Sequence, residues 1–218
     1  VRWLLVLLVV ALPTSGIEID DDIQEYSHVT CGSVVKLEHV SSGYRLHSHD
    51  VKWGSGSKQQ SVTCQGNKDD ANSLWTIKGG HNTICPQGTP IRNGWKVRLT
   101  HQQTGKNLHS HLHKSPLSQQ QELSCYGSNG NGDAGDDWIV EIPEGDGFLR
   151  RGQRFRLKHA STNKWLHSHD NVRFNSNNCG GSCPIMGQQE ATAFDWGDDH
   201  NNWWTTAEGF YFPVHRLE

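Results

Sequence analysis

A short motif that occurs three times, at intervals of about 60 residues, constrains the fold of this 218-residue chain more than any other feature. Each copy is a turn glycine followed by alternating apolar and polar residues that end in Leu-x-His. The copies occupy residues 32–39, 94–101 and 152–159. Alternation with a period of two is typical of a strand with one buried face, so the motif leucines are expected in a core. These leucines are Leu37, Leu99 and Leu157.

Further segments follow each motif copy in the same order. A turn leads to a short strand that ends in Leu-His-Ser-His at residues 46–49, 108–111 and 166–169, which predicts a β-hairpin in each repeat. A glutamine-containing strand follows at residues 60–64, 121–125 and 189–193. A tryptophan closes each repeat: Trp75, Trp138, and Trp203 or Trp204. Four strands in each of three repeats predict an all-β domain of about twelve short strands around a pseudo-threefold axis.

The repeated Leu-His-Ser-His segment and two other stretches resemble the stromal cell-derived factor 2 family of MIR-domain proteins. The other stretches lie at residues 54–63, which contain Gly-Ser-Gly-Ser and Gln-Gln-Ser-Val-Thr, and at residues 88–91, Gly-Thr-Pro-Ile. The resemblance covers about residues 28–212. It implies a β-trefoil of three MIR repeats, at about residues 28–87, 88–148 and 149–212, without catalytic residues of its own.

The same resemblance implies a function. It predicts a non-catalytic protein of the endoplasmic-reticulum lumen that associates with the Hsp70-type chaperone BiP and its J-domain partner in quality control of misfolded client proteins. The alternative is a secreted β-trefoil module that binds a glycan or a peptide. Neither role implies a cofactor. Nucleic acid is an unsuitable partner for this chain, because its net charge of -3 and pI near 6.5 provide no basic stripe.

The two ends of the sequence bear on its location. Arg2, an apolar run at residues 3–12 and small residues up to Gly16 predict a signal peptide at residues 1–16, followed by an acidic linker at residues 17–27. An apolar run of this length is too short to span a bilayer, so the mature chain is expected to contain no membrane span. The C-terminal tail, residues 213–218, has no retrieval tetrapeptide, which leaves secretion as the alternative to retention in the lumen.

The six cysteines predict disulfides, since a secretory signal implies an oxidising compartment. Cys31 and Cys85 each lie shortly before a repeat begins and are predicted to pair. Cys179 and Cys183 are predicted to form a local bridge within an insert at residues 171–187. Cys64 and Cys125 occupy equivalent positions in neighbouring repeats and are expected to approach each other near the axis. The sequence contains no Asn-x-Ser/Thr acceptor, so no N-linked glycan is expected.

The Leu-His-Ser-His segments supply the candidate site residues. Two histidines that alternate on a strand point the same way and could chelate zinc. They could equally form a surface for a peptide or glycan. We favour a structural role, because imidazole both donates and accepts hydrogen bonds where three hairpins meet, and we predict no metal. The candidate residues are His47, Ser48, His49, Asp50, His109, Ser110, His111, His167, Ser168, His169 and Asp170.

The tryptophans and the absence of catalytic motifs narrow the function further. Trp75, Trp138 and Trp203 are expected to fill the core. Four others are expected to be partly exposed: Trp53, Trp95, Trp165 and Trp204. No Gln-x-Trp occurs, which weakens the lectin hypothesis, and neither a Gly-x-Ser-x-Gly motif nor a recurring acid indicates an enzyme.

Overall fold

The computed structural model describes residues 26–214 and places four strands in each repeat, as the pattern of the sequence predicts. The first repeat holds β1 (Val34–His39), β2 (Arg45–Lys52), β3 (Gln60–Gln65) and β4 (Trp75–Gly79). The second holds β5 (Lys96–His101), β6 (Asn107–Lys114), β7 (Gln121–Tyr126) and β8 (Trp138–Glu141). The third holds β9 (Arg156–His159), β10 (Trp165–Arg173), β11 (Gln189–Phe194) and β12 (Trp204–Phe210).

The helices are short and lie between strands. One turn precedes the last strand of each repeat: η1 (Ala71–Ser73), η2 (Ala134–Asp136) and η3 (His200–Asn202). The insert of the third repeat contains α2 (Ser176–Cys179). Between residues 26 and 214, no helix has the length and apolar character needed to cross a bilayer. The predicted signal peptide at residues 1–16 lies outside the described residues.

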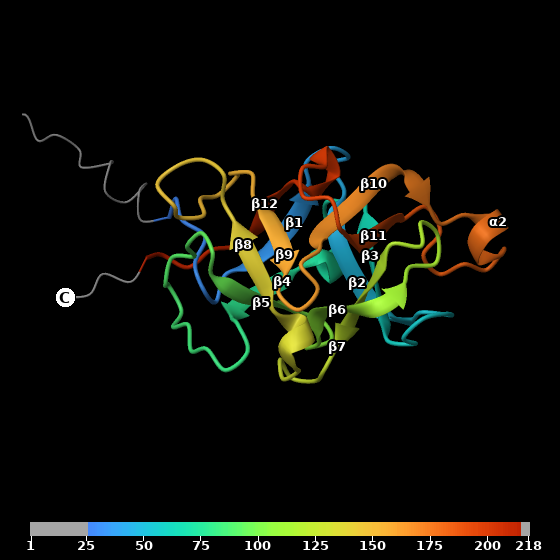
Figure 1. Ribbon diagram of the computed structural model, residues 1–218, viewed down its shortest axis with the longest axis horizontal. Coiled ribbons are helices and arrows are strands. Elements are labelled where there is room, and N and C mark those ends of the chain that lie inside the picture. Colours follow the sequence, from blue (N-terminus) through green and yellow to red (C-terminus); the bar gives the residue numbers. More distant parts are fainter. Residues whose placement is uncertain (1–25, 215–218) are drawn as a thin grey trace, which may run out of the picture.

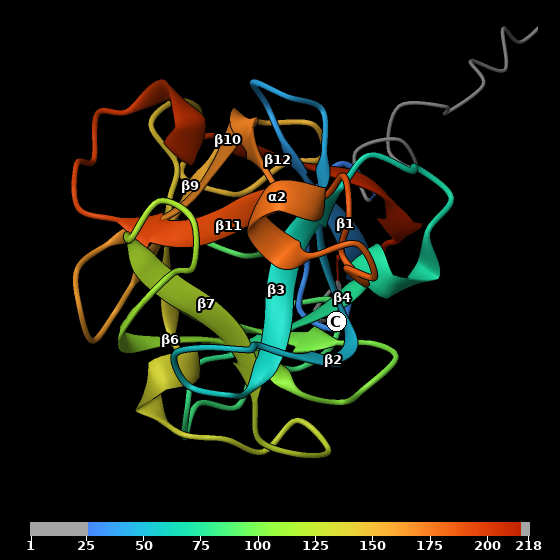
Figure 2. The same cartoon turned by 90° about the vertical axis from the view of Figure 1, so that its right-hand side faces the viewer.

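Six strands form a closed ring and six form a cap on it (Figures 1 and 2). The ring runs β1-β4-β5-β8-β9-β12 through antiparallel pairs, and it closes where Phe155 bridges to Trp204 and β12 pairs with β1. The cap consists of the hairpins β2–β3, β6–β7 and β10–β11. Their inner strands β3, β7 and β11 pair with one another as a triangle, which Figure 2 shows nearly face on. The structure is therefore the predicted all-β trefoil of twelve strands.

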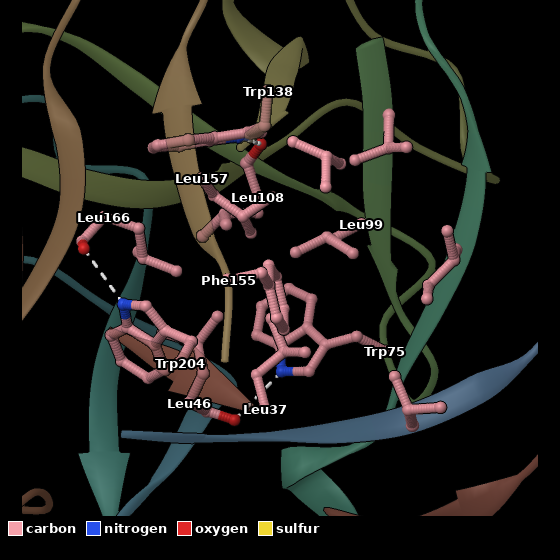
Figure 3. Packing of buried hydrophobic residues seen from close by; sticks show 14 of the residues in the cluster. Leu37, Leu46, Trp75, Leu99, Leu108, Trp138, Phe155, Leu157, Leu166 and Trp204 are labelled. Carbon is pink, nitrogen blue, oxygen red and sulfur yellow. Dashed lines mark hydrogen bonds between the residues drawn. The ribbon is translucent and has the colours of Figure 1, made fainter. Parts of the chain in front are cut away.

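A tryptophan joins ring to cap in each repeat (Figure 3). The indole N–H of Trp75 donates to the carbonyl of Leu46 at 2.9 Å, that of Trp138 to Leu108 at 3.1 Å, and that of Trp204 to Leu166 at 2.9 Å. These three tryptophans and three leucines are fully buried, and the motif leucines Leu37, Leu99 and Leu157 pack beside them. The equivalence of the three bonds confirms the pseudo-threefold arrangement.

Three of the tryptophan assignments were wrong, those of Trp203, Trp204 and Trp53. Trp204, and not Trp203, is the core residue of the third repeat: it is fully buried, whereas Trp203 is partly exposed. Adjacent residues of a strand point to opposite faces, so only one of them can enter the core. Trp53 is also buried, because Phe174 from the insert packs against it at a ring distance of 5.9 Å. Trp95 and Trp165 are partly exposed, as predicted.

The last residue of each motif copy, His39, His101 or His159, holds its repeat to the preceding one; we call these the clasp histidines. Each Nε2 bonds at 2.9 Å to a backbone carbonyl of the preceding repeat, at Asn201, Asn72 or Gly135. Each Nδ1 lies 2.8 Å from a hydroxyl of its own repeat, at Ser42, Thr104 or Thr162. Each ring also packs on a core tryptophan at 5.0 to 5.1 Å. The third repeat precedes the first in this cycle, so the clasps close the ring.

The predicted disulfides Cys31–Cys85 and Cys179–Cys183 are present. The first ties the entry of the first repeat to the linker into the second, and the second brackets the end of α2. Cys64 and Cys125 lie in the cap strands β3 and β7 as free, buried thiols. Each contacts a serine of another repeat; Cys125 Sγ lies 3.3 Å from Ser48 Oγ. Burial raises the pKa of each thiol to about 12.

Because the clasp histidines are buried, we expect the folded protein to lose stability in acid. Burial lowers the pKa of His39 and His101 to about 4, whereas in the unfolded chain both return to about 6.5. Between these values the unfolded chain binds protons that the folded chain does not. The free energy of unfolding should therefore fall as the pH falls from 6.5 to 4, by up to about 1.4 kcal/mol per pH unit for each histidine.

Urea unfolding at a series of pH values between 7 and 4 measures this slope. The control is His101→Gln, which lowers stability at neutral pH but removes one titrating clasp, so its slope should be shallower. Equal slopes for the two proteins would show that His101 does not contribute.

We expect the two free thiols to be alkylated only after the protein unfolds. Because thiolate is the reactive form, Cys64 and Cys125 should resist iodoacetamide at pH 8 in the native protein and react after unfolding in guanidinium chloride. Mass spectrometry should then find two alkylated cysteines and two intact disulfides. Rapid alkylation under native conditions would contradict the burial of these thiols.

Candidate functional site

The Leu-His-Ser-His segments lie on the outer strands of the cap hairpins, β2, β6 and β10. The structure does not gather them at the axis, because the inner strands β3, β7 and β11 occupy that position. Each segment instead lies near the clasp histidine of the following repeat. His101 interacts electrostatically with His47 and His49, His159 with His109 and His111, and His39 with His169. The candidate residues therefore form three separate sites, one at each repeat junction.

The serine of each segment is part of the cap. Ser48, Ser110 and Ser168 are buried. Their hydroxyls donate at 2.7 to 2.9 Å to carbonyls of the adjacent inner strand, at Ser61, Glu122 and Glu190. In the first two repeats the hydroxyl also accepts a bond from the side-chain amide of Gln60 or Gln121, and that amide bonds to a threonine of the following repeat. All three serines are buried and hydrogen-bonded within the cap, and are therefore unavailable to a ligand.

The first histidine of each segment holds the neighbouring short helix. His47 Nδ1 donates to Asp70 at 2.6 Å, His109 Nδ1 to Asp136 at 2.9 Å, and His167 Nδ1 to Asn202 at 2.7 Å. All three rings are at most 6% exposed. Burial lowers the pKa of His47, and it lowers that of His167 to about 4, so both are neutral at physiological pH.

The second histidine of each segment, at position 49, 111 or 169, is half-buried and has a different partner in each repeat. His49 Nδ1 lies 2.8 Å from His47 Nε2, and His111 Nε2 donates to Glu122 at 3.1 Å. His169 Nε2 has no partner among residues 26–214. Burial lowers the pKa of His49 and His169. Along each segment, the second histidine is therefore the first residue whose hydrogen-bond partner differs in kind between all three repeats.

The residue after the second histidine is solvent-exposed. Asp50 and Asp170 occupy this place in the first and third repeats, and Leu112 occupies it in the second, with 85% of its surface exposed. Asp50 lies 3.9 Å from Lys106 of the second repeat. The inner part of each segment, Leu-His-Ser, is thus buried and the same in all three repeats. The outer part, which consists of the second histidine and the residue after it, is more exposed and has different contacts or residues in each repeat.

Metal binding has little support from this geometry. Within residues 26–214, a single group of three possible ligands lies close together: His109, Asp133 and Asp136. Asp136 is buried and already accepts from the side chain of Asn107 and the backbone N–H of Asp133, as part of the capping box of η2. These carboxylate bonds give the group a structural role.

Two features of the surface did not emerge from the sequence. A groove of about 360 Å³ lies beside the Cys31–Cys85 bridge, with Ile84 and Trp95 on its wall. A second pocket of about 350 Å³ lies on the cap between the hairpin of the first repeat and the insert of the third.

The sequence motifs also did not reveal two buried glutamates of the cap, Glu122 and Glu190. An alignment of the three glutamine-containing strands would have shown that both share a position with Ser61.

Comparisons with known proteins agree with this geometry. The family model described as "MIR domain" matches residues 52–170. The chain is 48% identical to a stromal cell-derived factor 2-like protein of Dictyostelium discoideum over 84% of each chain. It is 46% identical to human stromal cell-derived factor 2, covering 87% of this chain and 84% of the relative. The crystal structure of the SDF2-like protein from Arabidopsis thaliana superposes with a TM-score of 0.80 at 41% identity, over 87% of this chain and 99% of that one. The chain therefore belongs to the stromal cell-derived factor 2 family of MIR-domain proteins.

Proposed function

We propose that this protein is a non-catalytic binding component of quality control in the endoplasmic-reticulum lumen. In this role it associates with a lumenal Hsp70-type chaperone of the BiP kind, with the J-domain partner of that chaperone and with misfolded client proteins. Membership of the stromal cell-derived factor 2 family carries the proposal, with 46 to 48% identity over most of the chain.

The disulfides support the proposed compartment. Cys31–Cys85 and Cys179–Cys183 require an oxidising environment to form and persist, and the lumen of the endoplasmic reticulum is such an environment. Cys64 and Cys125 are compatible with it, since burial and a raised pKa protect both thiols from oxidation and exchange.

The outer part of the motif supports a binding role. Leu112 lies between His111 and His113 on β6, and the two rings are 4.7 Å apart. The strand is anchored by the buried inner part of the motif, so Leu112 is presented on a rigid element. In the other repeats the equivalent residue is an aspartate. Three junctions on one scaffold therefore present different chemistry to a partner.

Affinity capture tests the proposed association. The full chain is immobilised and exposed to endoplasmic-reticulum lysate with and without ATP. We expect retention of the chaperone and its J-domain partner. Since a chaperone also binds unfolded chains as clients, the control is His101→Ala, which lacks one clasp. Capture that increases with this destabilisation would show that the protein is held as a client. Retention on a glycan array without any chaperone would favour the alternative of a secreted glycan-binding module.

Substitutions in the inner and outer parts of the motif should separate stability from binding. His47→Ala removes a buried, charge-assisted bond to Asp70, whose carboxylate keeps only its bonds from Ser73 and Asn72, and should lower the free energy of unfolding by about 1–3 kcal/mol. Capture should then fall only in proportion to unfolding. Leu112→Ser should leave the melting temperature nearly unchanged and weaken capture.

Lys114→Gln is the matched control for the outer position, because Lys114 is exposed on the same strand outside the motif. It should change neither the melting temperature nor capture. If Leu112→Ser behaves like Lys114→Gln, the partner contacts another part of the surface.

A further inference from the structure

At two of the three repeat junctions, a buried glutamate of the cap holds the hairpin loop of the preceding repeat. Glu190 accepts from the backbone N–H groups of Leu117 and Ser118 at 2.7 and 2.9 Å. Glu122 accepts from the backbone N–H of Ser57 at 3.3 Å and from the hydroxyl of the same serine. Both glutamates are fully buried. A buried carboxylate is stable when such donors satisfy it, so this contact stabilises both of these junctions.

The third junction lacks this carboxylate. Ser61 occupies the position of the two glutamates, directly after the glutamine that begins the strand. It is 1% exposed, and its hydroxyl oxygen has no hydrogen-bond partner among the described residues. An unsatisfied buried hydroxyl costs free energy and requires an explanation.

The loop opposite Ser61 also has a free donor. Pro184-Ile185-Met186 of the insert corresponds to Pro116-Leu117-Ser118, and in each loop a residue with positive φ follows, Gly187 or Gln119. The backbone N–H of Ile185, which corresponds to the Leu117 donor, has no acceptor within residues 26–214. Two unpaired donors therefore lie where the other junctions place a carboxylate.

The pocket of about 350 Å³ on the cap lies at this junction, and both Ser61 and Ile185 line it. Its walls are apolar: Trp53, Phe174 and Ile185 form a small separate core. Lys52 is the single charged residue in the lining. The pocket thus combines apolar walls, a cation and unpaired donors, and none of the residues that line it is acidic.

We propose that this pocket binds the carboxylate of a glutamate or aspartate side chain on a partner polypeptide, with an apolar neighbour of that residue packed on Trp53 and Phe174. The internal counterparts identify the ligand, because a glutamate side chain fills the equivalent place at the other two junctions. The Ser61 hydroxyl and the Ile185 N–H donate to the carboxylate, and Lys52 supplies the opposite charge at the rim. This site goes beyond the proposed chaperone association and does not depend on it.

Titration with short peptides tests the site, and the NMR chemical shifts of the Trp53 indole N–H and of the backbone amides around it report on binding. The probe is acetyl-Ala-Leu-Glu-Leu-Ala-amide, and its matched control carries Gln in place of Glu. We expect the Glu peptide to bind at least about tenfold more tightly, since a charge-assisted hydrogen bond is worth more than a neutral one. Equal binding of the two peptides would overturn the proposal.

A third peptide, the Gln sequence with a free C-terminal carboxylate, distinguishes the source of the acid. Binding of this peptide as tight as that of the Glu peptide would overturn the assignment to an acidic side chain and show that the pocket accepts chain ends.

Ser61→Glu is the decisive variant, because it gives the third junction its own carboxylate. We expect it to abolish binding of the Glu peptide while the protein remains folded. Gln103→Glu adds the same charge at an exposed turn and should bind as the wild type does. Ser61→Ala, which removes one donor, and Lys52→Gln should each weaken binding several-fold. These two variants decide the matter if Ser61→Glu fails to fold, and unchanged affinity in both would overturn the proposal.

Discussion

The contact between each clasp histidine and the preceding repeat is the interaction on which the rest of the structure depends. His101 bonds to the Asn72 carbonyl and packs on Trp75, and Trp75 in turn donates to the carbonyl of Leu46. One chain of contacts thus joins a ring strand to the neighbouring repeat and then to the cap. Since Leu46 is the first residue of a Leu-His-Ser-His segment, the same contacts also fix where that segment lies.

Local patterns in the sequence were sufficient to predict the strands, the threefold arrangement and both disulfides. Alternating burial and turn residues are encoded within a few residues of each other, and a repeat shows them three times. The identity of the third core tryptophan was not encoded in this way. Trp203 and Trp204 are adjacent, a shift of one residue exchanges the two faces of a strand, and the partner that decides between them, the carbonyl of Leu166, is distant in sequence. The burial of Trp53 depends on Phe174 in an insert of the third repeat, which no local pattern reveals.

The sequence was sufficient to locate the candidate residues, but it did not show which of them are buried and structural and which are exposed. Alternation along the strand places the serine of each segment on one face and both histidines on the other. Burial then decreases along the strand towards its exposed end, from Leu46 to Asp50 in the first repeat. This gradient follows the short helix, which bonds through its cap or its own residues to the first histidine, whereas the second histidine has other partners or none among the described residues. Its position depends on the turn before the last strand, where the repeats have different sequences.

The cyclic order of the clasps has a consequence for biosynthesis. His39, which ends the first strand, finds its carbonyl partner at Asn201, 162 residues later, and its tryptophan at Trp204. A chain emerging from the ribosome therefore cannot complete even its first repeat until nearly all of the domain has been made. Contacts between distant residues also slow folding, because a long loop must close before they form. During that interval β1 lacks its neighbour β12, and the apolar side chains of its inner face stay open to other proteins.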